Sequence, residues 1–298
     1  MSKTKLVLHT VTNQQQLDDL CNCPEMLQIR KLCKDLSDPS VKSGNLPGFC
    51  IVCDKHVKFS YDWLYSDEKS INFRERLICP ICGLNNRQRA MLGVLLQCEL
   101  PANDDCTSRI YLNEYVTPFY RIAAKRLSAD FEVIGSEFLG FDIPPGTVVN
   151  NIRHEDASNM SFADNSLDAI VSNDVFEHVQ DIETAFSEAY RTLKTGGKLI
   201  FSVPFTFTDK TKKRAQIVDG ELVHLEEPAY HGNPVSSDGA LVFYDFGWDM
   251  LDVCKDAGFS NVYMAAYFSE YLGNLCEFPL FVFIAEKNLK KLGATCNA

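Results

Sequence analysis

Two pairs of cysteines, each with a two-residue spacer, constrain the fold of this chain more than any other feature of its sequence. The pairs are Cys50-Ile-Val-Cys53 and Cys79-Pro-Ile-Cys82. Such a spacer lets both thiolates of a pair reach one ion from a tight turn, and Gly83 permits the backbone angles of that turn. The segments 56–63 and 71–78 between the pairs alternate as strands do. The sequence therefore predicts a zinc ribbon with these four cysteines as tetrahedral ligands.

Two other interpretations of the four cysteines stay open. An iron–sulfur cluster would use the same ligands, and buried free thiols would need no metal. The chain has 12 cysteines, and its first residues hold an apolar stretch too short for a secretory signal. We therefore expect a cytoplasmic protein whose cysteines are mostly thiols or metal ligands.

The overall charge narrows the partners that the chain could bind. Its net charge is -11 and its pI is about 5.0. A surface of this kind repels polyanions unless a local basic patch overrides it, which disfavours nucleic acids and anionic membranes as partners. No apolar run reaches the roughly 18 residues of a membrane helix, and the oligomeric state stays open.

Strand and helix patterns alternate from residue 107 onward, which predicts right-handed βαβ units and a parallel sheet with covered faces. The predicted strands are 109–112, 131–134, 148–153, 167–172, 198–203, 261–267 and 280–285, and the predicted helices are 118–127, 181–193 and 246–257.

Breaker-rich segments divide the chain into three predicted parts. Residues 1–45 form an N-terminal helical extension, with a helix from Gln16 to Leu36. Residues 46–100 form the four-cysteine module and a linking helix that begins at Asn86. After a linker at 101–105, residues 101–298 form the α/β domain, in which 205–240 lack a regular pattern and are expected to act as a lid.

Ligands of open parallel sheets bind at the carboxyl ends of the strands. Glu137 follows the second predicted strand of this sheet. A carboxylate there can accept hydrogen bonds from both hydroxyls of a ribose, although a solvated surface acid is the simpler interpretation of a single glutamate.

Residues 155–179, followed by 194–203, resemble the central block of the class I S-adenosylmethionine-dependent methyltransferases. The resemblance extends over about 105–286. The segments 79–89, 230–234 and 243–248 are similar to a bacterial subgroup that carries an N-terminal four-cysteine zinc ribbon. The resemblance implies a Rossmann-like, seven-stranded sheet of order 3-2-1-4-5-7-6, with 261–267 and 280–285 as its closing hairpin, and S-adenosylmethionine as cofactor.

The resemblance also implies roles for residues at the strand ends. Glu137 would bind the ribose hydroxyls, Asp156 the adenine amino group, and Ala157 the adenine ring through its N–H. Asn173 would lie beside the methionine moiety. Phe138 and the first loop, with Glu114 and Tyr115, complete the predicted cofactor site.

That first loop departs from the family pattern because residues 112–117 contain no glycine. Glycine normally lets the loop backbone approach the cofactor closely, so the departure puts the geometry of Glu114 and Tyr115 in question. It also leaves a non-catalytic cofactor-binding or scaffold protein open as a function. The absence of Gly-x-Gly-x-x-Gly after the first strand weighs against a nicotinamide oxidoreductase.

The lid supplies the candidate catalytic residues. We expect His231 to act as a general base or to contact the methyl acceptor, with His224 as the second candidate. The acidic pI and the long lid favour a small-molecule or sugar-type acceptor, methylated on oxygen or nitrogen. The alternative is an RNA methyltransferase whose ribbon grips its substrate, against which the net charge stands.

Overall fold

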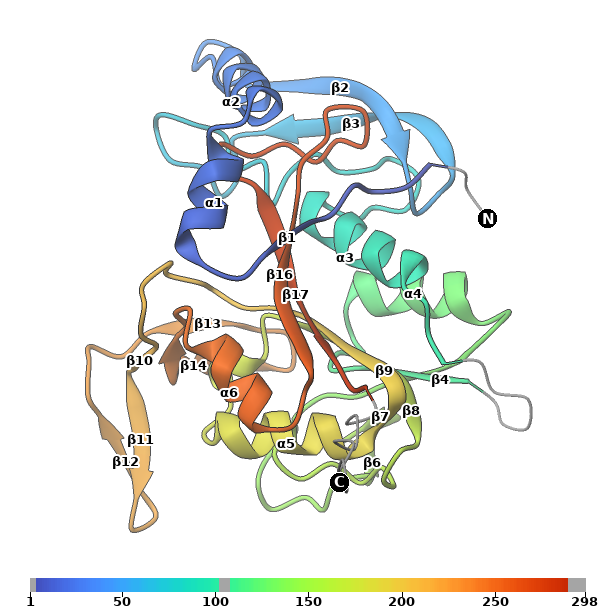
Figure 1. The fold of residues 1–298 in the computed structure, drawn as a ribbon, viewed down its shortest axis with the longest axis vertical. Coiled ribbons are helices and arrows are strands. Elements are labelled where there is room, and N and C mark those ends of the chain that lie inside the picture. The colour runs from blue at the N-terminus through green and yellow to red at the C-terminus, as the bar shows by residue number, and fades with distance from the viewer. Residues whose placement is uncertain (1–3, 102–107, 289–298) are drawn as a thin grey trace, which may run out of the picture.

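A mixed seven-stranded sheet forms the centre of the molecule (Figure 1). The computed structural model describes residues 4–101 and 108–288, so most of the predicted linker 101–105 lies outside the described residues. Strands β4, β5, β8 and β9 are parallel, whereas β17 is antiparallel to β9, β16 to β17 and β1 to β16. In sheet order the strands are β1 (His9–Val11), β16 (Asn261–Tyr267), β17 (Leu280–Glu286), β9 (Leu193–Ser202), β8 (Leu167–Asn173), β4 (Arg109–Leu112) and β5 (Glu132–Gly135).

This order confirms the predicted Rossmann-like sheet and differs from the prediction at both edges. Predicted strands 2, 1, 4, 5, 7 and 6 are β5, β4, β8, β9, β17 and β16. The third predicted strand is instead a hairpin of β6 (Val148–Val149) and β7 (Ile152–Arg153), because Asn150 and Asn151 adopt positive φ angles of 51° and 64°. An isolated parallel bridge between His154 and Glu137 is what remains of its pairing with the sheet among the described residues. The seventh strand, β1, comes from the N-terminal segment.

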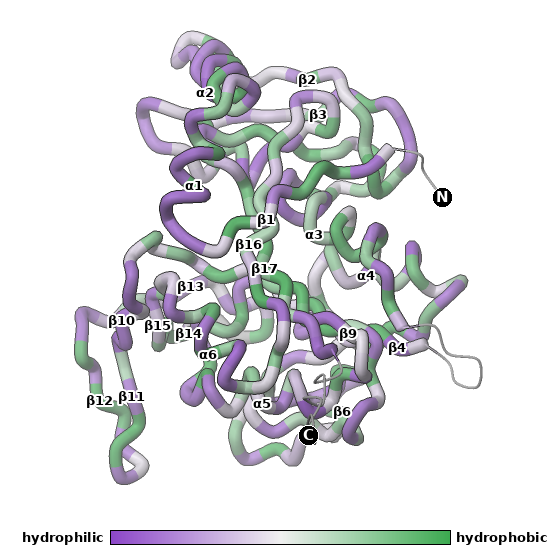
Figure 2. The backbone as a smooth tube through the Cα atoms, in the orientation of Figure 1, coloured by the Kyte–Doolittle hydropathy of each residue, from purple (hydrophilic) through white to green (hydrophobic). Residues whose placement is uncertain are grey.

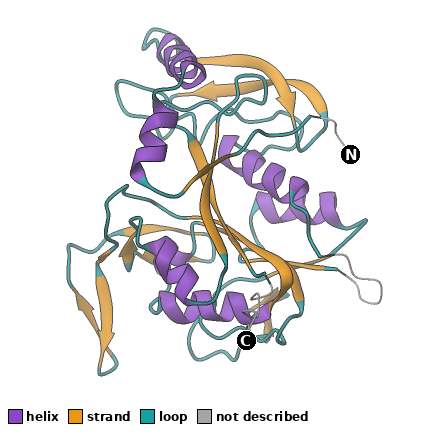
Figure 3. Ribbon diagram, viewed as in Figure 1, coloured by secondary structure: helices purple, strands orange, loops and turns teal. Residues whose placement is uncertain are grey.

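Helices cover both faces of the sheet (Figures 1 and 3). One face buries α3 (Asn86–Gln97) and α4 (Pro118–Leu127), and the other buries α5 (Ile182–Thr192) and α6 (Met250–Asp256). Consecutive residues of β9 point to opposite faces, so Ile200 joins the first hydrophobic cluster and Phe201 the second. No helix in the described ranges has the length and apolar character needed to cross a membrane.

The predicted N-terminal helix is broken into two. α1 (Gln14–Cys21) ends before Asn22, and α2 (Pro24–Leu36) begins at Pro24. Proline suits the first turn of a helix, where its missing N–H is not needed, and it starts a new helix at this point. Figure 2 shows α2 as largely hydrophilic and the central strands as largely hydrophobic. Besides these two helices, the predicted helical extension contains β1, an edge strand of the main sheet.

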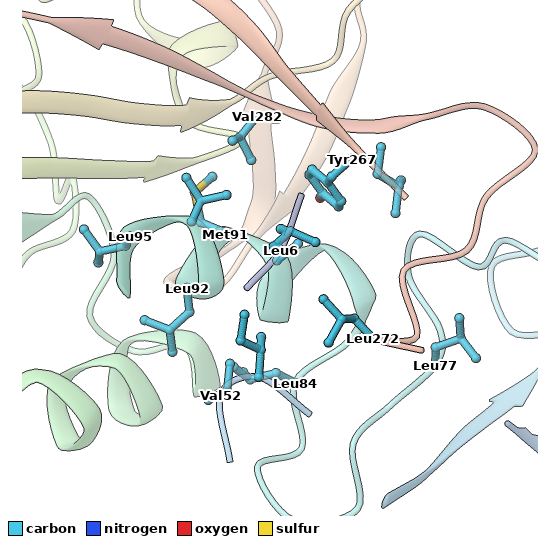
Figure 4. Close-up of a cluster of buried hydrophobic side chains, with 14 of the residues drawn as sticks. Leu6, Val52, Leu77, Leu84, Met91, Leu92, Leu95, Tyr267, Leu272 and Val282 are labelled. Atoms are coloured by element: carbon cyan, nitrogen blue, oxygen red, sulfur yellow. The ribbon is translucent and has the colours of Figure 1, made fainter. Parts of the chain in front are cut away.

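The ribbon is a hairpin of β2 (Ser43–Cys50) and β3 (Lys55–Asp62) that packs on the sheet. The predicted strand at 71–78 is irregular, with a turn at 73–75 and one bridge between Ser60 and Ile78. The first hydrophobic cluster joins Leu6, Val52 and Leu92 to Tyr267 and Val282 of the sheet (Figure 4). The N-terminal segment, the ribbon and the α/β part thus share one core, and the predicted boundaries between them stay a prediction.

The segment expected to lack a regular pattern contains short antiparallel hairpins, which corrects that expectation. Polar residues and turn formers hid the alternation, since these strands are only two to six residues long and most residues of β10 to β13 are exposed. The strands are β10 (Lys212–Lys213), β11 (Ala215–Val218), β12 (Glu221–His224), β13 (Tyr230–Asn233), β14 (Ser236–Leu241) and β15 (Tyr244–Asp245).

Candidate functional site

The four predicted zinc ligands come together. Their sulfur atoms all lie within 4.8 Å of one another, with 3.9 Å between Cys50 and Cys82 and 3.8 Å between Cys53 and Cys79. A tetrahedral site with zinc–sulfur bonds of about 2.3 Å requires separations of about 3.8 Å. Gly83 adopts a φ of 74°, as the knuckle turn requires. Burial raises the pKa of Cys53 to about 12, so a bound cation is needed for four thiolates at neutral pH.

A buried arginine stands beside the sulfur cluster. The Arg89 guanidinium is 1% exposed and lies 4.0 Å from the Phe59 ring centroid. It donates hydrogen bonds to the carbonyls of Leu77 and, at 2.8 Å, Gly273. A four-thiolate zinc site carries a net negative charge, which this cation partly compensates. Arg89 therefore ties the ribbon to the loop between β16 and β17.

A cavity of about 220 Å³ opens at the carboxyl ends of the parallel strands. Three predicted cofactor residues line it: Phe138, Asp156 and Ala157. Further lining residues come from strand ends and from the segment after β8: Tyr111, Asn113, Ser136, Val175, His178 and Gln180. The Tyr111 hydroxyl lies 2.6 Å from the Ser136 hydroxyl. Asn113 Oδ1 is buried and has no hydrogen-bond partner among the described residues.

The Glu137 side chain holds the glycine-free loop that follows β4. Glu137 Oε1 accepts hydrogen bonds from the N–H groups of Tyr115 at 2.8 Å and Val116 at 2.9 Å. The carboxylate thus fixes the loop after β4 with one oxygen and keeps the other for a further donor.

Glu114 and Asn173 form a separate contact at the same end of the sheet. Asn173 Nδ2 donates to Glu114 Oε1 at 2.5 Å, and Thr117 donates to the other oxygen. Burial raises the pKa of Glu114 above its usual value. Neither residue is among those that line the cavity, and their role toward the cofactor stays a prediction.

A carboxylate and two histidines meet at the edge of the cavity. Glu177 and His178 lie on the 3₁₀ turn η1 (Phe176–His178), and His231 comes from β13. Glu177 Oε1 lies 3.4 Å from His231 Nδ1 and 3.6 Å from His178 Nε2. The Glu177 side chain is fully buried, and this carboxylate raises the pKa of His231 above its usual value. The hairpin β13–β14 therefore carries a predicted catalytic histidine to the cavity edge.

His224, the second candidate, has a different position. It ends β12, is exposed, and pairs with Ala215 across the β11–β12 hairpin. That hairpin projects from the body of the molecule at the lower left of Figure 1. The structure thus separates the two histidines that the sequence put forward together.

The sequence prediction missed Tyr111, Asn113, Ser136 and Glu177. Asn113 and Ser136 were visible just after predicted strands and Tyr111 lies within one, but the sequence alone gave no reason to assign them a role. Glu177 and His178 were visible as an adjacent pair, but their relation to His231 depends on a hairpin that the sequence did not reveal.

Known proteins resemble parts of the chain. Residues 121–201 match the model of a methyltransferase-domain family. Demethylmenaquinone methyltransferases from two strains of Bacteroides fragilis are 46% identical over 121 residues, which is 38% of this chain and 47% of theirs. The chain thus spans about half the length of the curated relatives it matches.

Solved structures of methyltransferases are also similar, at low identity. An S-adenosylmethionine-dependent methyltransferase from Mesorhizobium loti is 16% identical, with 66% of this chain and 96% of that chain covered and a TM-score of 0.39. The 1,6-didemethyltoxoflavin-N1-methyltransferase of Burkholderia thailandensis is 14% identical, with coverages of 68% and 77% and a TM-score of 0.37. Because these scores are low, the fold assignment rests on the strand order.

Proposed function

We propose that the chain is a class I S-adenosylmethionine-dependent methyltransferase that transfers a methyl group from S-adenosylmethionine to a small-molecule acceptor. Residues 121–201 match a methyltransferase-domain family, and the sheet has the strand order of this class. The observation that carries this proposal is the cavity at the carboxyl ends of β4, β5 and β8, within a sheet of the matching strand order. Ligands of open α/β sheets bind at this edge.

The residues around the cavity suit this cofactor. The buried, unpartnered Oδ1 of Asn113 would accept a hydrogen bond from the ammonium group of the methionine moiety. Asp156, Phe138 and Ala157, which line the cavity, would hold the adenine. Glu137 is not one of the lining residues, and its second oxygen would bind a ribose hydroxyl. When bound, the cofactor supplies a methyl group on a sulfonium, and the chain's own task is to align the acceptor with it.

We propose His231 as the residue that contacts the acceptor, since Glu177 orients it at the cavity edge. His224 is a weaker candidate because of its exposed position on the β11–β12 hairpin. A small-molecule acceptor is supported by the name of the Bacteroides fragilis relatives and by the net charge of -11. Arg74 and Arg87 of the ribbon form ion pairs with Glu75 and Asp174, which leaves them poorly suited to bind the phosphates of an RNA.

We further propose that Cys50, Cys53, Cys79 and Cys82 hold one structural zinc ion. The sulfur separations of 3.8 and 3.9 Å support it, and closed four-ligand sites of this kind leave no position for a substrate.

Calorimetric titration with S-adenosylmethionine tests the proposed function. We expect the wild-type protein to bind it and Asp156→Ala to bind about 5- to 10-fold more weakly, as for one lost hydrogen bond of about 1 kcal/mol. Asp130→Ala, an exposed aspartate after α4, is the matched control and should bind as the wild type does. Absence of binding by the wild-type protein would refute the proposal.

A transfer assay with radiolabelled cofactor and extract fractions then tests the acceptor class. Methylation of low-molecular-weight material should survive nuclease treatment. Loss of all label on nuclease treatment would instead identify RNA as the acceptor.

A further inference from the structure

The side chains of Glu177, His178 and His231 form a cluster with the spacing of a metal site. Their ligand atoms lie within 4.8 Å of one another, and the two ring nitrogens lie 3.4 and 3.6 Å from the same carboxylate oxygen. Nitrogen and oxygen ligands bound at about 2.0–2.1 Å in tetrahedral geometry are separated by about 3.3–3.4 Å. The three groups are thus placed as ligands of one ion would be.

The hydrogen bonding of His178 fixes which of its nitrogens faces the cluster. Nδ1 lies 2.8 Å from the Leu241 carbonyl oxygen, which only accepts, so Nδ1 carries a proton and donates it. In the neutral ring Nε2 then presents a lone pair toward Glu177 Oε1, which is also an acceptor. Metal-bound histidines generally donate their other N–H to a carbonyl or carboxylate in this way.

The carboxylate itself lacks partners. Both oxygens of Glu177 are buried, and neither has a hydrogen-bond partner within the described ranges. A fully buried carboxylate without a hydrogen bond is costly, and within the described residues only the two histidines lie against it as possible cations. Asp174 and Asp245 lie nearby, and the arginines beside them, Arg87 and Arg214, are paired with those two aspartates. A metal ion between the carboxylate and the two ring nitrogens would balance this buried charge.

We propose that Glu177, His178 and His231 bind one divalent first-row transition metal ion, such as zinc, manganese or cobalt. Two imidazoles and one carboxylate suit these metals and leave coordination positions open. Since His178 also lines the cavity, the ion lies at its edge. In consequence, and here the inference rests on the proposed function, the acceptor binds the ion through a hydroxyl, and the reaction is an O-methylation.

The chemistry balances without a further reactant. The metal lowers the pKa of the bound hydroxyl, which releases its proton to solvent. The acceptor oxygen then forms a bond to the methyl carbon as the carbon–sulfur bond breaks, and the electron pair of that bond stays on sulfur. The metal is neither oxidised nor reduced.

The fold makes the site depend on one hairpin. His231 lies at an irregularity in the β13–β14 pairing, where the register shifts between His231 and Asn233. Gly239, at a φ of 76°, faces it, and a Cβ there would lie 2.9 Å from the His231 carbonyl oxygen. The metal would therefore tie this hairpin to the end of β8 through η1.

Cobalt binding to protein whose ribbon already holds zinc tests the site. We expect calorimetry and visible absorption to detect one additional cobalt ion per chain, without the thiolate charge-transfer bands that cobalt in the ribbon would give. His231→Ala should weaken this binding at least about 100-fold, beyond the effect of losing an outer-shell partner. His231 is 42% exposed in its side chain, so its variant should fold. His224→Ala, on the neighbouring hairpin, is the matched control and should bind cobalt as the wild type does.

A second variant and a cofactor titration distinguish loss of the metal site from loss of folding or of cofactor binding. Glu177→Gln should also lose the second cobalt ion, with its fold checked by retained ribbon zinc. S-adenosylmethionine affinity measured on the same samples separates the two proposals, because a protein that binds the cofactor but no second metal contradicts the metal site alone. Equal cobalt binding by the wild type and His231→Ala would overturn the inference, as would a wild-type protein with no site besides the ribbon.

Discussion

Glu137 holds the loop after β4 and is proposed to bind the cofactor. One oxygen accepts hydrogen bonds from the N–H groups of Tyr115 and Val116. In the proposed function the other oxygen binds a ribose hydroxyl. A loop without glycine lacks the backbone freedom that a close approach to the cofactor normally uses. In this chain Glu137 instead holds the loop through the N–H groups of Tyr115 and Val116.

Glu137→Ala should weaken S-adenosylmethionine binding by about 1.5–3 kcal/mol, the scale of hydrogen bonds to a charged group. Calorimetry measures the change. Glu132→Ala is the control, since this residue begins the same strand and forms an exposed ion pair with Arg109. An unchanged affinity in Glu137→Ala would mean that the end of β5 does not contact the cofactor.

The location of a single residue was predictable where it follows from its position along a strand. Phe138, Asp156 and Ala157 line the cavity because they follow strands whose ends the pattern located. Glu114 and Asn173, also predicted as cofactor residues, bond to each other outside the cavity lining, and their role toward the cofactor stays a prediction. That contact depends on the three-dimensional path of the loop, which hydrophobic periodicity does not encode.

Among the elements, the ribbon was predictable because metal ligands leave a rigid spacing in the sequence. Its second predicted strand was not found, since 71–78 turns to bring Arg74 and Arg76 to their partners. The lid hairpins escaped prediction for the opposite reason. Short exposed strands bury no continuous face, so their sequences show no period.

Cys79→Ser should remove the zinc from the ribbon and lower the free energy of unfolding by at least about 3 kcal/mol. Structural zinc contributes roughly 10–16 kcal/mol of apparent binding free energy in small modules, of which a three-ligand site retains a part. Metal analysis and thermal unfolding measure both effects. Cys21→Ser, a half-buried thiol outside the cluster, should retain zinc and stability. Stoichiometric zinc in Cys79→Ser would contradict the assignment of the ligands.

At the scale of the whole molecule, the sequence suggested three successive parts, and the structure joins them. β1 extends the main sheet, and the core around α3 contains residues of the N-terminal segment, the ribbon and the sheet (Figure 4). Neither contact is visible in the sequence. An edge strand of three residues resembles an ordinary loop, and a helix that shares its hydrophobic face with other parts of the chain resembles any other amphipathic helix.

A half-buried ion cluster links the ribbon and α3 to the candidate site. Asp174, which follows β8 with a φ of 50°, lies 3.3 Å from Arg74 and 3.2 Å from Arg87, and accepts a hydrogen bond from Ser202 at 2.8 Å. Although burial opposes it, Arg87 and Arg74 hold the pKa of Asp174 below its usual value. The ribbon therefore stabilises the turn that leads to Glu177 and His178.

Asp174→Asn should lower the free energy of unfolding by about 1.5–3 kcal/mol at neutral pH, the scale of hydrogen bonds to a charged group. Asparagine tolerates the positive φ of this position, so the loss reflects charge and not backbone strain. The pKa of Asp174 is lower in the folded protein than in the unfolded chain. Its stabilisation is therefore complete above the unfolded value of about 3.9 and is lost as the pH falls through the folded value.

Urea unfolding between neutral pH and about pH 3 measures the difference between the wild type and Asp174→Asn, which should shrink as Asp174 takes up its proton. Asp164→Asn is the control, because this carboxylate is 68% exposed in its ion pair with Arg191 and should contribute less than about 1 kcal/mol at any pH. A difference that stays constant down to the lowest pH would show that Asp174 acts through packing and not through its charge. The arginines of the ribbon would then contribute little to holding the segment that carries Glu177 and His178.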